Sequence, residues 1–241
     1  MKTLLKLVGV WWVSLSVLPA QSETRVVKFR VLCQEHVKDV LKGFVAGTTV
    51  KKQEVEFLSG GFGPQLGGKF ADGKVRFYAE MPGPDGKPVP TVVGEGDLVD
   101  SPMQMFFLLP QTRPNAPIYR VMAFPDEEKA FPMGATRVVN LAPMEIRLTL
   151  AGIDQPAIKA GGVAVYPQSK KVDEWNMFSA RIDIYAEKKW VPAVTQSWKA
   201  SNRKRELVIF QMDPATQSPT IRMYQDIPPW RETKLPGSGT P

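Results

Sequence analysis

The sequence has little of the chemistry that most catalytic and metal sites need, with one cysteine (Cys33) and one histidine (His36) in 241 residues. A single cysteine forms no intramolecular disulfide, and the two residues cannot supply the ligands of a Cys/His zinc site. Alternation along an extended segment places Cys33 on an apolar face, so we expect a buried structural cysteine and a surface histidine. We therefore expect no metal site and no cofactor.

Apolar runs long enough to cross a membrane are also missing. Lys2 and Lys6 precede a twelve-residue apolar run, Leu7–Leu18, which is followed by the small residues of Ala20-Gln21-Ser22. A spanning helix needs about 20 apolar residues, so this pattern predicts a cleaved signal peptide over residues 1–22, with an uncleaved anchor as the alternative. We expect a periplasmic or secreted protein without a transmembrane span after cleavage.

Long amphipathic helical patterns are absent, and 22 prolines and 19 glycines interrupt the chain. What is present instead is alternation of apolar and polar residues, which indicates half-buried strands. Two uninterrupted apolar runs, Met105–Leu109 and Leu207–Met212, are typical of strands buried on both faces. The clearest alternating segments are Thr24–Gln34, Lys74–Met81, Met144–Ala151 and Ala180–Ala186. The expected fold class is all-β, with antiparallel β-sandwich architecture.

A polar, proline-flanked segment at 125–134 separates two strand-rich halves of about the size of a small sandwich. We expect two tandem Ig-like β-sandwiches, over 23–128 and 129–230, with a single larger sandwich as the alternative. Residues 231–241 are expected to form a disordered tail.

Positive charge is concentrated in the second half. Residues 23–130 hold 14 basic and 14 acidic side chains, whereas residues 131–241 hold 15 basic and 10 acidic ones. In an exported protein such an excess favours an anionic envelope polysaccharide or an envelope protein as partner, and not nucleic acid.

The second half also holds tryptophans next to basic residues, a combination that suits an anionic polymer or a sugar ring. The opposing interpretation is that sandwich cores bury tryptophan, and that basic residues keep hairpin edges charged and soluble. The candidate binding residues are Lys170, Lys171, Trp175, Lys188, Lys189, Trp190, Trp198, Arg203, Lys204 and Arg205.

Carboxylates cluster at Glu95, Asp97 and Asp100, and again at 126–128. Paired carboxylates suit glycoside hydrolysis, so an enzyme acting through Asp97 or Asp100 is a rival hypothesis. Both clusters lie in turn-like contexts where acidic residues are common for structural reasons, so we assign no catalytic residue.

The segment Arg137-Val138-Val139-Asn140-Leu141-Ala142-Pro143, followed by an alternating strand that ends at Gly152, resembles a known signature. It is similar to the start of a family of uncharacterised extracytoplasmic Ig-like β-sandwich domains, itself distantly similar to the periplasmic accessory protein of alginate acetylation. The resemblance covers roughly residues 118–227. It implies a non-enzymatic envelope domain and carries over no catalytic residue.

Together these observations predict a non-catalytic cell-envelope or secreted interaction module, which binds an anionic polymer or protein through its basic C-terminal half. The alternative is a carbohydrate-binding module that uses surface tryptophans.

Overall fold

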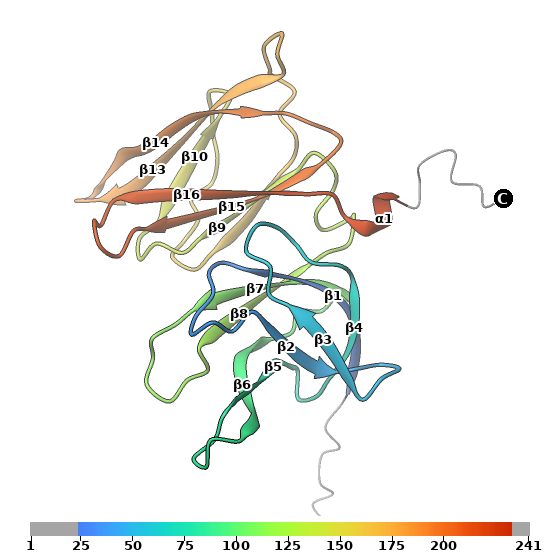
Figure 1. The fold of residues 1–241 in the computed structure, drawn as a ribbon. Coiled ribbons are helices and arrows are strands. Elements are labelled where there is room, and N and C mark those ends of the chain that lie inside the picture. Colours follow the sequence, from blue (N-terminus) through green and yellow to red (C-terminus); the bar gives the residue numbers. More distant parts are fainter. Residues whose placement is uncertain (1–23, 233–241) are drawn as a thin grey trace, which may run out of the picture.

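The computed structural model describes residues 24–232 (Figure 1). These residues form sixteen strands, arranged in three sheets, and one short helix. The expected all-β class is confirmed. The predicted signal peptide and residues 233–241 of the predicted tail lie outside the described residues.

The N-terminal half is one eight-stranded sheet, which we call the barrel sheet. Its strand order is β3-β2-β5-β6-β8-β7-β1-β4. A bridge between Gly47 and Gly68 joins the end of β2 to β4, so the sheet curls into a barrel-like form. The strands are β1 (Arg25–Cys33), β2 (Lys42–Ala46), β3 (Lys52–Glu56), β4 (Leu66–Phe70), β5 (Lys74–Pro82), β6 (Pro88–Asp97), β7 (Met103–Pro110) and β8 (Tyr119–Pro125).

Aromatic rings fill the inside of the barrel sheet. Phe29 makes edge contacts with Phe70 and Phe77 at ring-centroid distances of 5.8 and 6.2 Å. Gly68 lies against this cluster, because a Cβ atom there would come within 2.8 Å of the Phe70 ring and 3.0 Å of the Phe29 ring. A residue without a side chain is therefore needed where the barrel closes.

The C-terminal half holds two four-stranded sheets, which we call the inner and outer sheets. The inner sheet has the order β12-β9-β15-β16, and the outer sheet has the order β11-β10-β13-β14. The strands are β9 (Thr136–Asn140), β10 (Ile146–Leu150), β11 (Ile153–Asp154), β12 (Val163–Tyr166), β13 (Met177–Ala186), β14 (Lys189–Lys199), β15 (Arg205–Met212) and β16 (Pro219–Asp226). Helix α1 (Pro229–Glu232) follows.

The inner sheet is the middle layer of the molecule (Figure 1). One of its faces contributes Val138, Val208 and Phe210 to a core shared with the outer sheet. Its other face contributes Val139 and Ile209 to a second core, shared with the barrel sheet. The buried runs predicted at Met105–Leu109 and Leu207–Met212 supply these layers, and the former run is buried throughout.

Strand β1 illustrates how alternation serves two cores. Val27, Phe29, Val31 and Cys33 face the barrel interior, as the sequence predicts. Leu32, on the opposite face, packs into the core against the inner sheet.

The same face of β1 carries Arg30, which enters a buried cluster of four charges between the two halves. Arg30 donates to Asp126 from Nε at 2.8 Å and to Asp226 from Nη1 at 2.6 Å. Arg205 donates to Asp226 from Nε at 2.6 Å and also pairs with Asp126. All four residues are at most 3% exposed. We call this set the interface ion cluster.

Two members of the interface ion cluster, Arg30 and Asp226, have pKa values shifted in the direction that favours their charged forms. Burial opposes ionisation of Asp226, but the hydrogen bond from Arg30 and the charges of Arg30 and Arg205 outweigh it, so the pKa of Asp226 lies below its ordinary 3.8. Arg137 is buried nearby and has no carboxylate partner among residues 24–232. Burial, and then the charge of Arg205, lower the pKa of Arg137 to about 10, and its guanidinium lies 4.2 Å from the Phe131 ring centroid.

Two features differ from the sequence-based expectation. The structure does not confirm an N-terminal sandwich, since β1–β8 belong to a single sheet. Two of the three sheets are mixed, because β1–β7 and β6–β8 pair in parallel in the barrel sheet and β9–β15 does so in the inner sheet. Alternation reports which face of a strand is buried but not which strand lies beside it. The division into domains at 128/129 stays a prediction, although β8 ends and β9 begins on either side of it.

The first two residues of the predicted tail, 231 and 232, are among the described residues. Arg231 and Glu232 belong to helix α1, and the indole N–H of neighbouring Trp230 donates to the Asp126 carbonyl oxygen at 3.2 Å. This hydrogen bond anchors the end of the described chain to the interface.

We predict that Asp226→Asn lowers the free energy of unfolding by roughly 3–5 kcal/mol, because it leaves buried arginine charge unpaired. The control is Asp100→Asn, which removes an exposed ion pair with Arg25 and should cause no measurable change. Urea denaturation followed by tryptophan fluorescence measures both. Equal, small effects would show that the interface ion cluster does not stabilise the fold.

Candidate functional site

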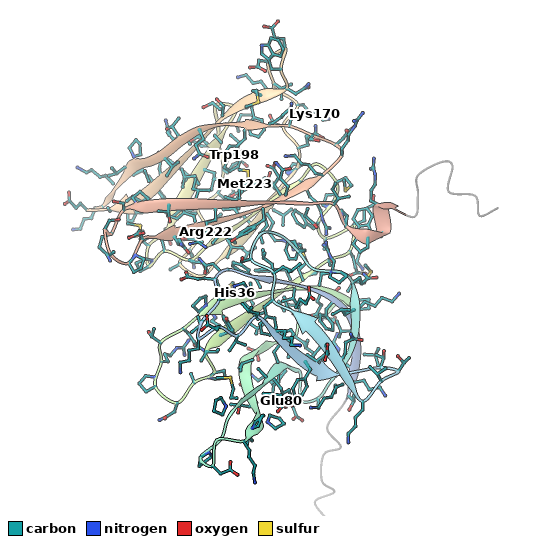
Figure 2. All side chains as sticks on the ribbon, viewed as in Figure 1. His36, Glu80, Lys170, Trp198, Arg222 and Met223 are labelled. Carbon is teal, nitrogen blue, oxygen red and sulfur yellow. The ribbon has the colours of Figure 1, made fainter. Side chains whose placement is uncertain are left out.

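The structure separates the ten predicted binding residues into three surface groups and two interior residues. Figure 2 shows Trp198 within the body of the C-terminal half and Lys170 at its margin. Trp198 is 3% exposed and packs edge-on against Phe178 in the core. Arg205 is fully buried in the interface ion cluster. Neither side chain is available to a partner at the surface.

The first surface group lies at the β13–β14 hairpin. Its turn residues, Glu187 and Lys188, have φ values of 49° and 64°. Trp190 packs against Tyr185 at 5.1 Å between ring centroids, and the Arg147 guanidinium lies 4.8 Å from its ring. Trp190 is therefore half-buried, while Lys188 and Lys189 are exposed.

The second group is Trp175, in the loop between β12 and β13. It is 71% exposed, the highest value among the exposed large hydrophobic side chains of the described residues. Asp173 Oδ1 accepts hydrogen bonds from the backbone N–H groups of Trp175 and Met177 at 2.9 and 2.8 Å. The backbone that carries the indole is thus held in place, although the ring itself faces solvent.

The third group surrounds a cavity of about 280 Å³, which we call the lysine cavity. Three of the predicted residues, Lys170, Lys171 and Lys204, line it. A fourth lysine, Lys199 at the end of β14, completes the set. Arg203 lies beside this group but outside its lining, in the exposed turn before β15.

The cavity lies at one end of the C-terminal half, between its two sheets. Tyr166, Thr136 and Glu206 are paired across β12, β9 and β15, so they share the face of the inner sheet that points toward the outer sheet. Leu150 and Phe178 line the cavity from the outer sheet. Regular strands therefore position one polar and one apolar wall.

The electrostatics of the lysine cavity favour an anion. Of the described residues that line it, Glu206 is the one carboxylate, against four lysines. Glu206 pairs with Lys204, whose Nζ lies 2.8 Å from Oε1. Within residues 24–232, no carboxylate is within ion-pair distance of Lys170, Lys171 or Lys199, whereas Lys52 and Lys74 of the barrel sheet are paired with carboxylates. Three positive charges at this site are thus left without an internal counter-charge.

Tyr166 adds an unusual polar group to the lysine cavity. The residue is only 7% exposed, and its hydroxyl has no hydrogen-bond partner among the described residues. Burial raises the pKa of Tyr166, so the hydroxyl keeps its proton at neutral pH. Because buried polar groups nearly always have partners, an unpaired hydroxyl in a residue of the cavity lining is unusual.

The remaining catalytic candidates are engaged in structural contacts. Cys33 is buried and its thiol donates to the Glu35 carbonyl oxygen at 3.1 Å. Asp97 pairs with Lys74, and Asp100 lies 3.3 Å from Arg25. Within residues 24–232 no group of three or more His, Cys, Asp or Glu side chains could hold a metal ion.

Sequence reasoning missed Lys199, Tyr166 and the interface ion cluster. Lys199 adjoins Trp198, and alternation alone would have put these two side chains on opposite faces. No sequence signal marked Asp126 or Asp226 as partners of Arg205, because the three residues come from separate segments.

Comparison of the chain with protein-family models and with curated proteins finds no match. No helix in the described part of the chain has the length and apolar character that membrane crossing requires.

We predict that the two tryptophans differ sharply in their contribution to stability. Trp198→Ala should lower the free energy of unfolding by roughly 3–5 kcal/mol, because it empties a core position. Trp175→Ala should change it by no more than about 0.5 kcal/mol, because the indole is exposed. Thermal and urea unfolding of both variants measure this, and a large loss for Trp175→Ala would contradict its placement at the surface.

Proposed function

We propose that the protein is a non-catalytic, exported interaction module, which binds an anionic envelope polymer or protein partner through its basic C-terminal half. One observation carries the proposal: four lysines surround a single cavity whose lining holds one carboxylate. Binding an anion there relieves the mutual repulsion of the lysines and supplies the missing counter-charge.

Sequence features supply the setting of this proposal. The charged and apolar pattern of residues 1–22 supports export to the periplasm or outside the cell. The resemblance around Arg137–Pro143 supports an Ig-like β-sandwich for the C-terminal half and an envelope role. Two four-stranded sheets that share one core are consistent with that sandwich.

Two residues of the segment Arg137–Pro143, which carries the resemblance, have polar side chains, and both make structural contacts. Asn140 donates to the carbonyl oxygens of Met144 and Ile158 at 2.8 and 3.1 Å, which fixes the turn after β9. Arg137 lies in the interface with the barrel sheet. The proposed binding function therefore rests on the lysine cavity and not on this segment.

We predict that the purified protein co-sediments with the insoluble envelope fraction of its source at low salt and is released at high salt. The triple variant Lys170→Gln/Lys171→Gln/Lys199→Gln should weaken binding roughly a hundredfold, because about 1 kcal/mol is lost for each lysine near an anionic surface.

The matched control for this experiment is Lys28→Gln/Lys51→Gln/Lys69→Gln, which removes three exposed lysines of the barrel half that form no ion pair among the described residues. It changes net charge equally and should leave binding unchanged. Equal losses of affinity for both triple variants would show that binding depends on overall charge and not on the lysine cavity. Absence of sedimentation at either salt concentration would reject the proposed function.

A second candidate function, a carbohydrate-binding module, is favoured by the exposed indole of Trp175. Sugar rings stack on such faces, and this contact resists salt. We predict for this alternative that insoluble neutral polysaccharide retains the protein at high salt, and that Trp175→Ala abolishes retention while the triple lysine variant does not. Failure of neutral polysaccharide to retain the unmodified protein would eliminate it.

A further inference from the structure

The lysine cavity differs from an ordinary basic surface patch in having neutral polar and apolar walls as well as charge. An electrostatic patch for a flexible polyanion needs only exposed lysines. Here the lining adds neutral side chains that donate and accept hydrogen bonds: Thr136, Gln155, Gln168, Ser169 and Ser201. Leu150 and Phe178 form an apolar wall.

The volume limits what this cavity holds. At about 280 Å³ it lies just below the range of about 300–1,000 Å³ that is typical of sites for drug-sized molecules. It therefore suits a group of about one six-membered ring and its substituents. A bare anion would leave the apolar wall and most of the neutral polar groups without a partner.

Tyr166 provides the second, independent observation. The residue belongs to the lining, and its buried hydroxyl has no hydrogen-bond partner among the described residues. Leaving a buried hydroxyl unpaired costs free energy, so a ligand that pairs with it gains affinity. Sugar hydroxyls both donate and accept, as this group does.

We propose that the lysine cavity binds one sugar ring that bears an anionic substituent. Lys170, Lys171 and Lys199 bind the anion, Tyr166 pairs with a ring hydroxyl, and the apolar wall packs against the C–H face of the ring. This inference rests on the proposed function, since it specifies the unit of the anionic polymer that the module recognises. Lysine ammonium groups act as point charges, so carboxylate, sulfate and phosphate share this chemistry.

The test is calorimetric titration of the purified protein with four ligands that share one ring: glucuronate, glucose 6-sulfate, glucose 6-phosphate and glucose. At least one anionic sugar should bind, and neutral glucose should bind at least tenfold more weakly. The preferred member of the three anionic sugars identifies the substituent. Absence of binding by all three anionic sugars would overturn the inference.

Tyr166→Phe is the decisive variant, because it removes only the unpaired hydroxyl. It should weaken binding of the preferred anionic sugar about tenfold, while thermal unfolding stays unchanged. Tyr185→Phe, at the exposed β13–β14 hairpin, is the matched control and should bind like the unmodified protein. Unchanged affinity in Tyr166→Phe would overturn the inference.

Two further measurements separate this inference from the proposed function. Lys199→Gln alters an exposed side chain, so folding should persist while the preference for charged over neutral rings falls several-fold. If Tyr166→Phe loses stability, Lys199→Gln serves as the test instead. An unchanged preference of Lys199→Gln for charged over neutral rings then overturns the inference. Polyacrylate is a polyanion without a sugar ring: if it binds as tightly as a polymer of the preferred sugar, the inference fails while anion binding stands. If neither polymer binds, both fail.

Discussion

The interface ion cluster is the constraint on which the arrangement of the two halves depends. Arg30 comes from the first strand, Asp126 from the link between the halves, and Arg205 and Asp226 from the last two strands. Each charge is buried, so each requires the others for compensation. Each half alone supplies one pair, Arg30 with Asp126 and Arg205 with Asp226, and the two cross-pairs form only when the barrel sheet and the inner sheet pack together. The cluster consequently specifies one docking geometry, which the surrounding apolar core alone would specify less strictly.

Strands β15 and β9 connect this interface to the lysine cavity. On β15, Arg205 points into the interface, whereas its neighbour Glu206 faces the cavity. On β9, Arg137 faces the interface and Thr136 faces the cavity. Because successive side chains of a strand point to opposite faces, fixing one face of the inner sheet fixes the other. The polar wall of the cavity is thus held by the contacts that hold the two halves together.

Alternation in the sequence was sufficient to predict the strand content, the inward face of β1 and the doubly buried core of β7. It could not predict the barrel-like closure, which depends on a bridge between Gly47 and Gly68 and on parallel pairing of β1 with β7. Such pairings join segments far apart in the chain, and the period of a strand carries no information about its neighbour. For the same reason the sequence marked Arg205 as a binding residue, although three distant segments bury it.

The candidate site was predictable in part, and the limit has a physical cause. Lys170, Lys171 and Lys204 were recognised because charge is visible in sequence, and loop and strand bring them to one cavity. Tyr166 could not be recognised, because an unpaired hydroxyl is a property of its surroundings: the same tyrosine with a neighbouring carbonyl oxygen would be an ordinary core residue. Among the described residues, this cavity is therefore distinguished by three lysines without a carboxylate partner and by one hydroxyl without a hydrogen-bond partner. A ligand that carries both an anionic group and a hydroxyl supplies a partner to the lysines and to Tyr166 together. A simple polyanion supplies only the first, which distinguishes it from an anionic sugar.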